Sequence, residues 1–371
     1  MRRCIIVILT GILLWAAAGR AETLLLTSDL HLTADAAEAP RLDALTAALD
    51  GCDAILLLGD LTNNAHAAEH EAVRAFLTAL SDTGAEVYAI PGNHDLSAAL
   101  GPRDYAALYA PWGWGRAFSR DSATASCAVM TRSGTCLLLL DTNALRGDGG
   151  AAPGGGIGEA TLTWVAATLE SLSSDTPVIA CGHHPILPPE DRAQTPGAGE
   201  LADALRRGGV RLYLCGHDHG FAAVQLDGLQ QITVGQPQAY PGWAGRLTVA
   251  ADALKWEVAP LYEGGDPVLL DMARSTAALS ESMARACLKD TPYEDDDTAI
   301  QWFTACFYHA VRADWTPELC SSLLNAPGAD IWRAIEPKNV VKRWIFGLLE
   351  RCPQSVQNIV IPLEKKERSQ K

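Results

Sequence analysis

Short apolar runs alternate with longer, helix-like segments through the first two thirds of the chain, and this alternation restricts the fold more than any other feature. Runs of four to eight apolar residues bounded by Gly, Asp and Pro are typical of buried strands. The segments between them repeat apolar residues at a spacing near 3.6, as amphipathic helices do. This alternation predicts an α/β fold in which helices cover the sheets. The predicted strands are 23–27, 54–58, 86–90, 136–140, 177–181 and 210–215, and the predicted helices are 41–49, 67–80, 159–172 and 199–207.

The pattern changes twice after Gly220. Residues 221–260 predict a meander of short strands, and from residue 264 the apolar spacing predicts helices separated by Pro, Gly and an acidic loop. We therefore divide the chain into an α/β domain at 22–263 and a helical C-terminal domain at 264–371. The helices predicted in the second domain are 268–288, 298–313, 317–324 and 338–351.

The first 21 residues have the features of a secretory signal peptide. Arg2 and Arg3 precede an apolar run at 4–18, and small residues around Arg20 offer a cleavage position. The apolar run is short for a membrane span, which needs about 20 residues. We expect an extracytoplasmic protein, secreted or held in the cell envelope, with no membrane span left after cleavage. The alternative is an uncleaved N-terminal anchor.

The formal net charge is −15, and most of it falls in residues 22–263, whose only lysine is Lys255. General nucleic-acid binding is therefore not expected, because affinity for phosphate backbones comes from Lys and Arg. If this acidic segment handles an anionic substrate, it needs local positive charge, and bound metal cations are the obvious source.

Nine cysteines remain once Cys4 is removed with the leader, and this odd number leaves at least one unpaired within a monomer. Those in apolar runs are expected to be small buried side chains. The pairing of the others is not predicted.

Five short polar motifs follow successive predicted strands. Six of the nine histidines lie in these motifs. Ligands of α/β sheets bind at the carboxyl ends of strands, so we expect the five turns to meet in one site. The motifs begin at Asp29 (DLH), Gly59 (GDLTN), Gly92 (GNHD), Gly182 (GHHP) and Gly216 (GHDH).

The residue types in these motifs suit divalent metals such as Mn, Fe or Zn, which accept carboxylate, amide oxygen and imidazole ligands. Asp29 and His31 are separated by one residue, as are His217 and His219, so each pair can turn toward one ion. The glycines before the polar residues permit sharp turns. Two ions about 3.5–4 Å apart can hold a phosphate group and activate water.

In this order, the five motifs resemble those of the calcineurin-like metallophosphoesterase superfamily, over about 29–219 and by extension over 22–263. The resemblance implies a four-layer α/β/β/α sandwich of two mixed sheets with a dinuclear metal centre. It implies that Asp29, His31 and His219 hold the first metal ion and that Asp60 bridges the two ions. It implies that Asn93, His183 and His217 hold the second.

The resemblance also implies catalytic roles for the His94–Asp95 pair. His94 would lie near the leaving oxygen as a general acid or charge stabiliser, and Asp95 would orient it. Asn63 departs from the family pattern, in which Asp is common, and this affects only local hydrogen bonds. His184 is not assigned as a ligand, although its position next to His183 makes that choice less secure. It is expected instead in the wall of the pocket.

The function implied is hydrolysis of a phosphomonoester or phosphodiester by hydroxide held on two divalent ions. In overall appearance the chain is closest to bacterial cyclic-nucleotide-phosphodiesterase-like members. The substrate would be a phosphorylated small molecule or a diester, and the oligomeric state is not predicted. The alternative is a non-catalytic scaffold of the same fold that acts through its helical domain.

Other features allow a competing interpretation. His66, Glu69 and His70 form H-x-x-E-H, the inverted zinc-protease motif, but no third ligand is identifiable, so we favour a solvated first helical turn. The glycine-rich segment at 147–158 lacks the lysine of a phosphate-binding loop and is interpreted as a flexible loop that could border the site. Trp112 and Trp114 could stack on a substrate or pack in a loop, and Asp141 is a candidate anchor behind the ligands.

Overall fold

The computed structural model describes residues 21–35, 39–187, 195–336 and 339–363. The predicted signal peptide lies outside the described residues, apart from Ala21. Within the described part of the chain, no helix is long and apolar enough to cross a membrane. The nine cysteines in this part are all free thiols.

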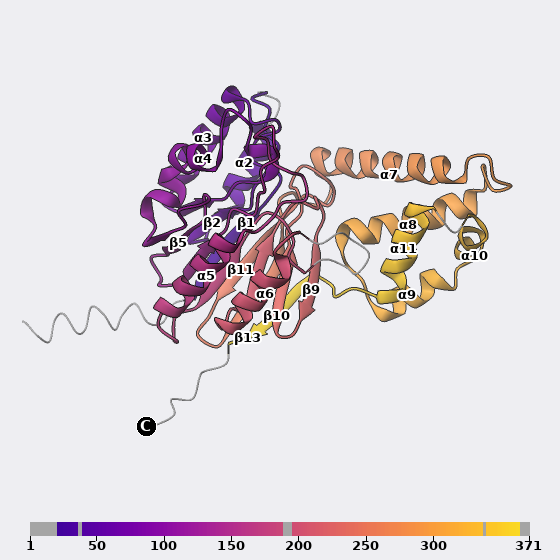
Figure 1. Cartoon of the computed structure of the whole chain (residues 1–371). Coiled ribbons are helices and arrows are strands. Elements are labelled where there is room, and N and C mark those ends of the chain that lie inside the picture. Colours follow the sequence, from indigo (N-terminus) through magenta and orange to yellow (C-terminus); the bar gives the residue numbers. More distant parts are fainter. Residues whose placement is uncertain (1–20, 36–38, 188–194, 337–338, 364–371) are drawn as a thin grey trace, which may run out of the picture.

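Two mixed β-sheets form the centre of the α/β region (Figure 1). The first sheet has the strand order β13-β12-β11-β1-β2-β3. Its strands are β1 (Glu22–Thr27), β2 (Ala54–Leu57), β3 (Glu86–Ala89), β11 (Trp243–Val249), β12 (Ala253–Pro260) and β13 (Asn358–Pro362). The second sheet has the order β4-β5-β6-β7-β8-β10-β9. Its strands are β4 (Ser119–Arg120), β5 (Cys127–Met130), β6 (Cys136–Leu139), β7 (Val178–Cys181), β8 (Leu212–Cys215), β9 (Ala222–Leu226) and β10 (Leu229–Thr233).

Alternate residues of the strands enter separate cores. Leu24 and Leu26 of β1 pack between the two sheets, whereas Leu25 packs on the outer face of the first sheet. This follows from the two-residue period of a strand, which turns successive side chains to opposite faces. Both faces of β1 and β2 are buried, which explains why these strands are continuous apolar runs in the sequence.

Helices cover the outer face of each sheet. Leu45 of α2 (Ala39–Ala48) and Leu77 of α3 (Ala67–Asp82) pack against the first sheet. Val165 of α5 (Glu159–Ser171) and Leu201 of α6 (Ala198–Arg207) pack against the second. The predicted four-layer α/β/β/α sandwich is therefore confirmed. The remaining short helices of this region are η2 (Asn93–Asp95), α4 (Pro102–Leu108), η3 (Ala110–Trp112) and η4 (Trp114–Arg116).

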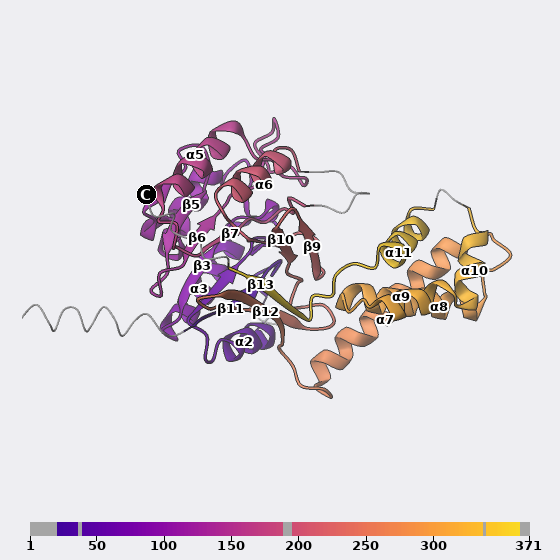
Figure 2. The same ribbon diagram turned by 90° about the horizontal axis from the view of Figure 1, so that it is seen from below.

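The C-terminal region is a helical insertion between two paired strands of the first sheet. Its helices enclose a separate core around Trp302, Phe303 and Trp332, and the region lies beside the sandwich (Figure 2). Its helices are α7 (Pro267–Leu288), α8 (Asp297–Arg312), α9 (Pro317–Leu324), α10 (Pro327–Ala334) and α11 (Val340–Arg351). After α11 the chain returns to the sandwich as β13, which pairs antiparallel with β12. The sequence analysis predicted four of these helices, and it missed α10 and the returning strand.

Candidate metal centre

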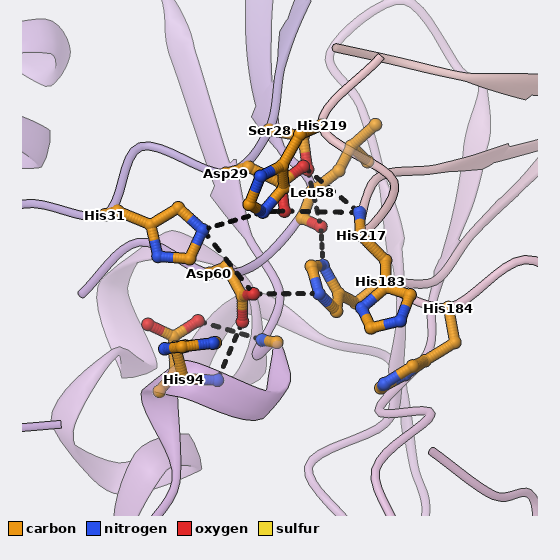
Figure 3. A network of polar contacts seen from close by, with 12 residues as sticks. Ser28, Asp29, His31, Leu58, Asp60, His94, His183, His184, His217 and His219 are labelled. Atoms are coloured by element: carbon orange, nitrogen blue, oxygen red, sulfur yellow. Dashed lines mark hydrogen bonds and ion pairs between the residues drawn. The ribbon is translucent and has the colours of Figure 1, made fainter. Parts of the chain in front are cut away.

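The side chains of the five motifs lie close together at one end of the two sheets. They follow β1, β2, β3, β7 and β8, and Figure 3 shows most of them around a common centre. Five of these residues have positive φ, between 46° and 73°: Asp29, His31, Asp60, His217 and His219. Non-glycine residues seldom adopt this left-handed backbone conformation, so the turns that direct these side chains inward are sharp and specific.

The first group of potential ligands comprises Asp29, His31, Asp60 and His219. One ligand atom from each lies within 4.8 Å of all the others. His31 Nε2 is 3.1 Å from His219 Nε2, and His219 Nε2 is 3.6 Å from the Asp29 Oδ1. Unprotonated nitrogen lone pairs this close to one another and to carboxylates have the arrangement of ligands around a cation.

The second group comprises His183, His184 and His217, whose ring nitrogens also lie within 4.8 Å of one another. His183 Nδ1 donates a hydrogen bond to the Leu58 carbonyl over 2.9 Å, because that oxygen can only accept. Its Nε2 is left 3.2 Å from Asp60 Oδ2. Asp60 also approaches His31, at 3.8 Å, so its carboxylate lies between the two groups.

Ligand atoms left without partners test whether metal ions fit here. Asn93 Oδ1 is buried and has no hydrogen-bond partner among the described residues, and His183 Nε2, also buried, faces the Asp60 carboxylate at 3.2 Å. Burial of an unpaired polar atom is costly, and both atoms are ordinary ligands of divalent ions. The donor set therefore fits two divalent cations, with Asp60 between them.

Burial sets the charge of these groups. It lowers the pKa of His31 and of His217 to about 4, so both are neutral near pH 7 and keep a lone pair for a metal. Burial also raises the pKa of the Asp29 carboxyl to about 7. Although burial opposes ionisation of Asp60, the adjacent His183 imidazole holds the pKa of Asp60 well below its usual range. Metal binding and protonation therefore compete for the same atoms.

Two glycines allow the motif loops to approach one another. A Cβ on Gly59 would lie 2.6 Å from His183 Nδ1, and Gly59 also has a φ of +91°. A Cβ on Gly92 would overlap the Asp60 carboxylate. Any larger residue at either position would force the ligand loops apart.

His94 is held at the edge of the centre by backbone groups. Its Nδ1 donates to the Asn63 carbonyl over 2.6 Å, so Nε2 is the ring nitrogen without a partner among the described residues, and its ring packs edge-on against that of His31. Its backbone N–H donates to Asp60 Oδ1 over 2.8 Å. Because residue 63 contributes its carbonyl to this bond, the departure from Asp to Asn does not affect it.

Asp95 has a different position from the one that the resemblance implied. Its carboxylate accepts hydrogen bonds from the backbone N–H groups of Gly92, Leu61 and Thr62, at 2.8–3.2 Å. The ring of His94 is oriented by Asn63 instead. Asp95 is fully buried and ties the loop after β2 to the loop after β3, so it shapes the site through the backbone.

His184 belongs to the second group by distance but is not assigned as a ligand. Its Nδ1 is 2.9 Å from the Thr142 Oγ1, and a Cβ on Gly155 would lie 2.6 Å from its ring, so the glycine-rich loop borders it. Asp141 accepts from the N–H and side-chain amide of Asn143, whose amide also reaches the Pro91 carbonyl. Asp141 thus anchors the segment that leads to Asn93.

The H-x-x-E-H segment forms the start of α3. Glu69 is buried and accepts from the backbone N–H groups of Asn64 and His66, at 2.8 and 3.1 Å. His70 is bonded to the Tyr109 hydroxyl, whereas the His66 side chain is largely exposed. The segment starts a helix as predicted, but the expectation of a solvated turn is wrong for Glu69 and His70, which are both buried. Trp112 is also buried and donates to the Ser81 Oγ, so it packs in the core and does not line the site.

The sequence profile of the family described as calcineurin-like phosphoesterase matches residues 22–221, which include all five motifs. The chain belongs to the calcineurin-like phosphoesterase family. A search of curated proteins found no significant match.

Solved structures with similar folds have low sequence identity to this phosphoesterase-family chain. Purple acid phosphatase PPD1 from yellow lupin is 12% identical, with 67% of this chain and 53% of that one covered and a TM-score of 0.46. Phosphopantetheinyl hydrolase from Mycobacterium tuberculosis is 18% identical, with 59% and 91% covered and a TM-score of 0.36. GAP50, the anchor in the inner membrane complex of Plasmodium, is 12% identical, with 66% and 86% covered and a TM-score of 0.43.

One residue beside the centre was missed by the motif analysis. Gln238, in the loop between β10 and β11, donates from Nε2 to the carbonyl oxygen of Asp29 over 2.7 Å. It lies 209 residues from Asp29 in the chain and belongs to none of the motifs, so no local pattern marked it.

Proposed function

We propose that this protein is an exported, dinuclear metal-dependent hydrolase of phosphomonoesters or phosphodiesters. The observation that carries the proposal is the convergence of the motif side chains around Asp60, with Asn93 Oδ1 buried and without a hydrogen-bond partner among the described residues. Family membership supports a phosphoester as the substrate bond. The proposed substrate is either a phosphorylated small molecule or a phosphodiester, and a cyclic nucleotide is one such diester.

The proposed ligand assignment follows the family resemblance, and it differs from the second group in taking Asn93 in place of His184. Asp29, His31 and His219 would hold the first cation, and Asn93, His183 and His217 the second, with Asp60 shared between them. Bound divalent ions would supply the positive charge that holds a phosphate group and activates water. The chain provides little such charge itself, because residues 22–263 are strongly acidic and have a single lysine.

His94 is the proposed proton donor to the leaving oxygen. The Asn63 carbonyl fixes the proton of the neutral ring on Nδ1, so Nε2 is the atom that can take up a proton and pass it on. The hydrogen bond from the His94 backbone to Asp60 keeps the ring next to the bridging carboxylate. Asp95 holds the loop after β2 and the loop after β3 together by accepting hydrogen bonds from their backbone N–H groups.

Turnover and metal content together test the proposed activity. The purified protein would be assayed with Mn²⁺ and with Zn²⁺ against p-nitrophenyl phosphate and bis-p-nitrophenyl phosphate, with Asp60→Asn as the control. We expect about two ions per chain and turnover that the control loses by at least ~10²-fold, because bound metal contributes several kcal/mol to such reactions. If the protein held no metal and its turnover did not exceed that of the control, the non-catalytic scaffold would be favoured.

Export is tested separately. If residues 1–21 are a signal peptide, protein recovered from outside the cytoplasm begins at Glu22. Protein that keeps Met1 and sediments with membranes would support the uncleaved anchor.

A further inference from the structure

The loop at residues 235–242, between β10 and β11, is bonded to two of the segments that carry proposed ligands. Gln238 Nε2 donates to the Asp29 carbonyl over 2.7 Å and approaches the Leu30 carbonyl at 3.4 Å. The Gln236 backbone N–H donates to the His219 carbonyl over 3.1 Å. The loop therefore connects the segment of Asp29 and His31 with the segment of His219.

These hydrogen bonds are made to backbone segments that contain residues in a strained conformation. Asp29, His31 and His219 all have positive φ, a conformation that persists only when surrounding contacts enforce it. The N–H groups of Asp29 and His31 are bonded to the carbonyls of Gly59 and Asp60. Gln238 holds the opposite, carbonyl side of the same turn. Its amide can be oriented only one way, because a flipped amide would place Oε1 against carbonyl oxygens.

The other end of the 235–242 loop contacts the helical insertion. The ring of Tyr240 lies 5.2 Å from that of Tyr308 on α8, in an edge-to-face arrangement. The Tyr308 hydroxyl donates to the Ala273 carbonyl of α7 over 2.7 Å. Met272 of α7 lies beside Gly242, with Sδ 3.5 Å from where a Cβ would be. The insertion thus supports the loop that holds Asp29.

We propose that Gln238 is a positioning residue for the first cation and that the helical insertion braces it through Tyr240 and Tyr308. This inference rests on the proposed metal centre and gives the insertion a role in it. Gln238 acts through the backbone of Asp29 and touches no reacting atom. Groups that orient metal ligands are worth roughly 10–100-fold in metal affinity.

The test compares Gln238→Met with Gln225→Met in the full chain. Methionine has a similar length but cannot donate, and Gln225 is exposed on β9, away from the centre. Mn²⁺ is titrated calorimetrically into metal-free protein, and melting is followed by circular dichroism. We expect Gln238→Met to weaken one of the two binding events about 10-fold, with the other event and the melting temperature little changed. Gln225→Met should match the original protein.

Tyr308→Ala and Tyr308→Phe test the brace. The alanine variant removes the ring that contacts Tyr240 and should weaken the same binding event several-fold, whereas the phenylalanine variant keeps the ring and should not. If Gln238→Met weakened neither binding event, or weakened both equally, the positioning role would be overturned. Unchanged affinity in Tyr308→Ala would overturn the brace. If the original protein itself binds no Mn²⁺, the result contradicts the proposed metal-dependent function, on which this inference rests.

Discussion

Five proposed ligand residues have left-handed backbones, and each such residue costs on the order of 1–3 kcal/mol. The protein offsets this cost with buried hydrogen bonds: Asp29 N–H to Gly59, His31 N–H to Asp60, and the Gln238 amide to Asp29. Strain held in this way fixes the side chains before any ion arrives. It is the expected design for a centre in which two cations must be held at a set separation.

At the residue scale, His94→Gln tests the proton donor. Glutamine cannot exchange a proton at neutral pH, so we expect kcat to fall about 10²-fold or more on a substrate with an alkoxide leaving group. The loss should be much smaller on p-nitrophenyl esters, whose leaving group needs no proton. Steady-state rates on both substrates provide the measurement, with metal content checked in parallel. His66→Gln, at an exposed position, is the matched control. Equal losses on both substrates would contradict the assignment.

A second residue-scale prediction concerns Glu22, at the opposite end of β1 from the metal centre. Burial raises its pKa, although the Thr135 hydroxyl donates to it over 2.5 Å. Because the folded protein binds this proton more tightly than the unfolded chain, the stability that Glu22 contributes is present at low pH. It is lost as the pH rises from the unfolded value, about 4.3, through the raised value.

Glu22→Gln should therefore gain stability relative to the original protein as the pH rises through that window, by at most ~1.4 kcal/mol per pH unit. Urea unfolding of both proteins at several pH values between 4 and 7 measures the difference. Titrating groups that do not interact with Glu22 cancel in this comparison, whereas Glu86 and Asp53 lie close enough to interact with it. A difference that stays constant with pH would mean that Glu22 is not desolvated.

At the element scale, the sequence predicted the central strands well because they are short apolar runs, most of them closed by Gly, Asp or Pro. β2 was expected at 54–58 and spans Ala54–Leu57. β13 was missed although Ile359 and Ile361 are buried while Val360 is exposed, the alternation of an edge strand. It is only five residues long and follows helices, and its partner β12 is a hundred residues earlier. Likewise, Gln238 reaches Asp29 through a backbone carbonyl, which leaves no mark on sequence motifs.

The start of α3 gives an element-scale prediction. Glu69→Ala removes a buried carboxylate that accepts from the N–H groups of Asn64 and His66. We expect a loss of about 1–2 kcal/mol in the free energy of unfolding. Metal content and kcat should change less than twofold, since this glutamate serves the helix and not a zinc site. Glu71→Ala, exposed on the same helix, should change neither. Loss of activity in Glu69→Ala with metal content unchanged would revive the protease interpretation, because in that motif the histidines hold zinc and the glutamate acts as the base.

At the scale of the whole molecule, the helices are inserted into the sandwich and are not appended to it. The insertion leaves and re-enters at adjacent points, because Glu257 of β12 is paired with Asn358 of β13. It has its own core, in which Phe303 stacks on Trp332 with ring centroids 5.0 Å apart. The returning chain belongs to the sandwich: the Trp256 indole donates to the Val356 carbonyl over 2.9 Å, and Ile361 packs between the sheets.

Two shortened proteins separate these contributions. A chain that ends at Glu263 loses Val356, Ile359 and Ile361 from the core between the sheets. Burial of each is worth roughly 1.5–3 kcal/mol, a large share of the 5–15 kcal/mol that stabilises a typical domain. This chain should be unfolded or insoluble.

A chain in which a short Gly-Ser linker replaces residues 264–354 keeps β13 and should fold, because the linker spans only the gap between paired strands. Soluble yield and urea unfolding measure the contrast. Since the second protein also lacks Tyr308, it should show the same weakened Mn²⁺ binding event as Tyr308→Ala. If the chain ending at Glu263 were as stable as the linked one, β13 would not be part of the sandwich in solution.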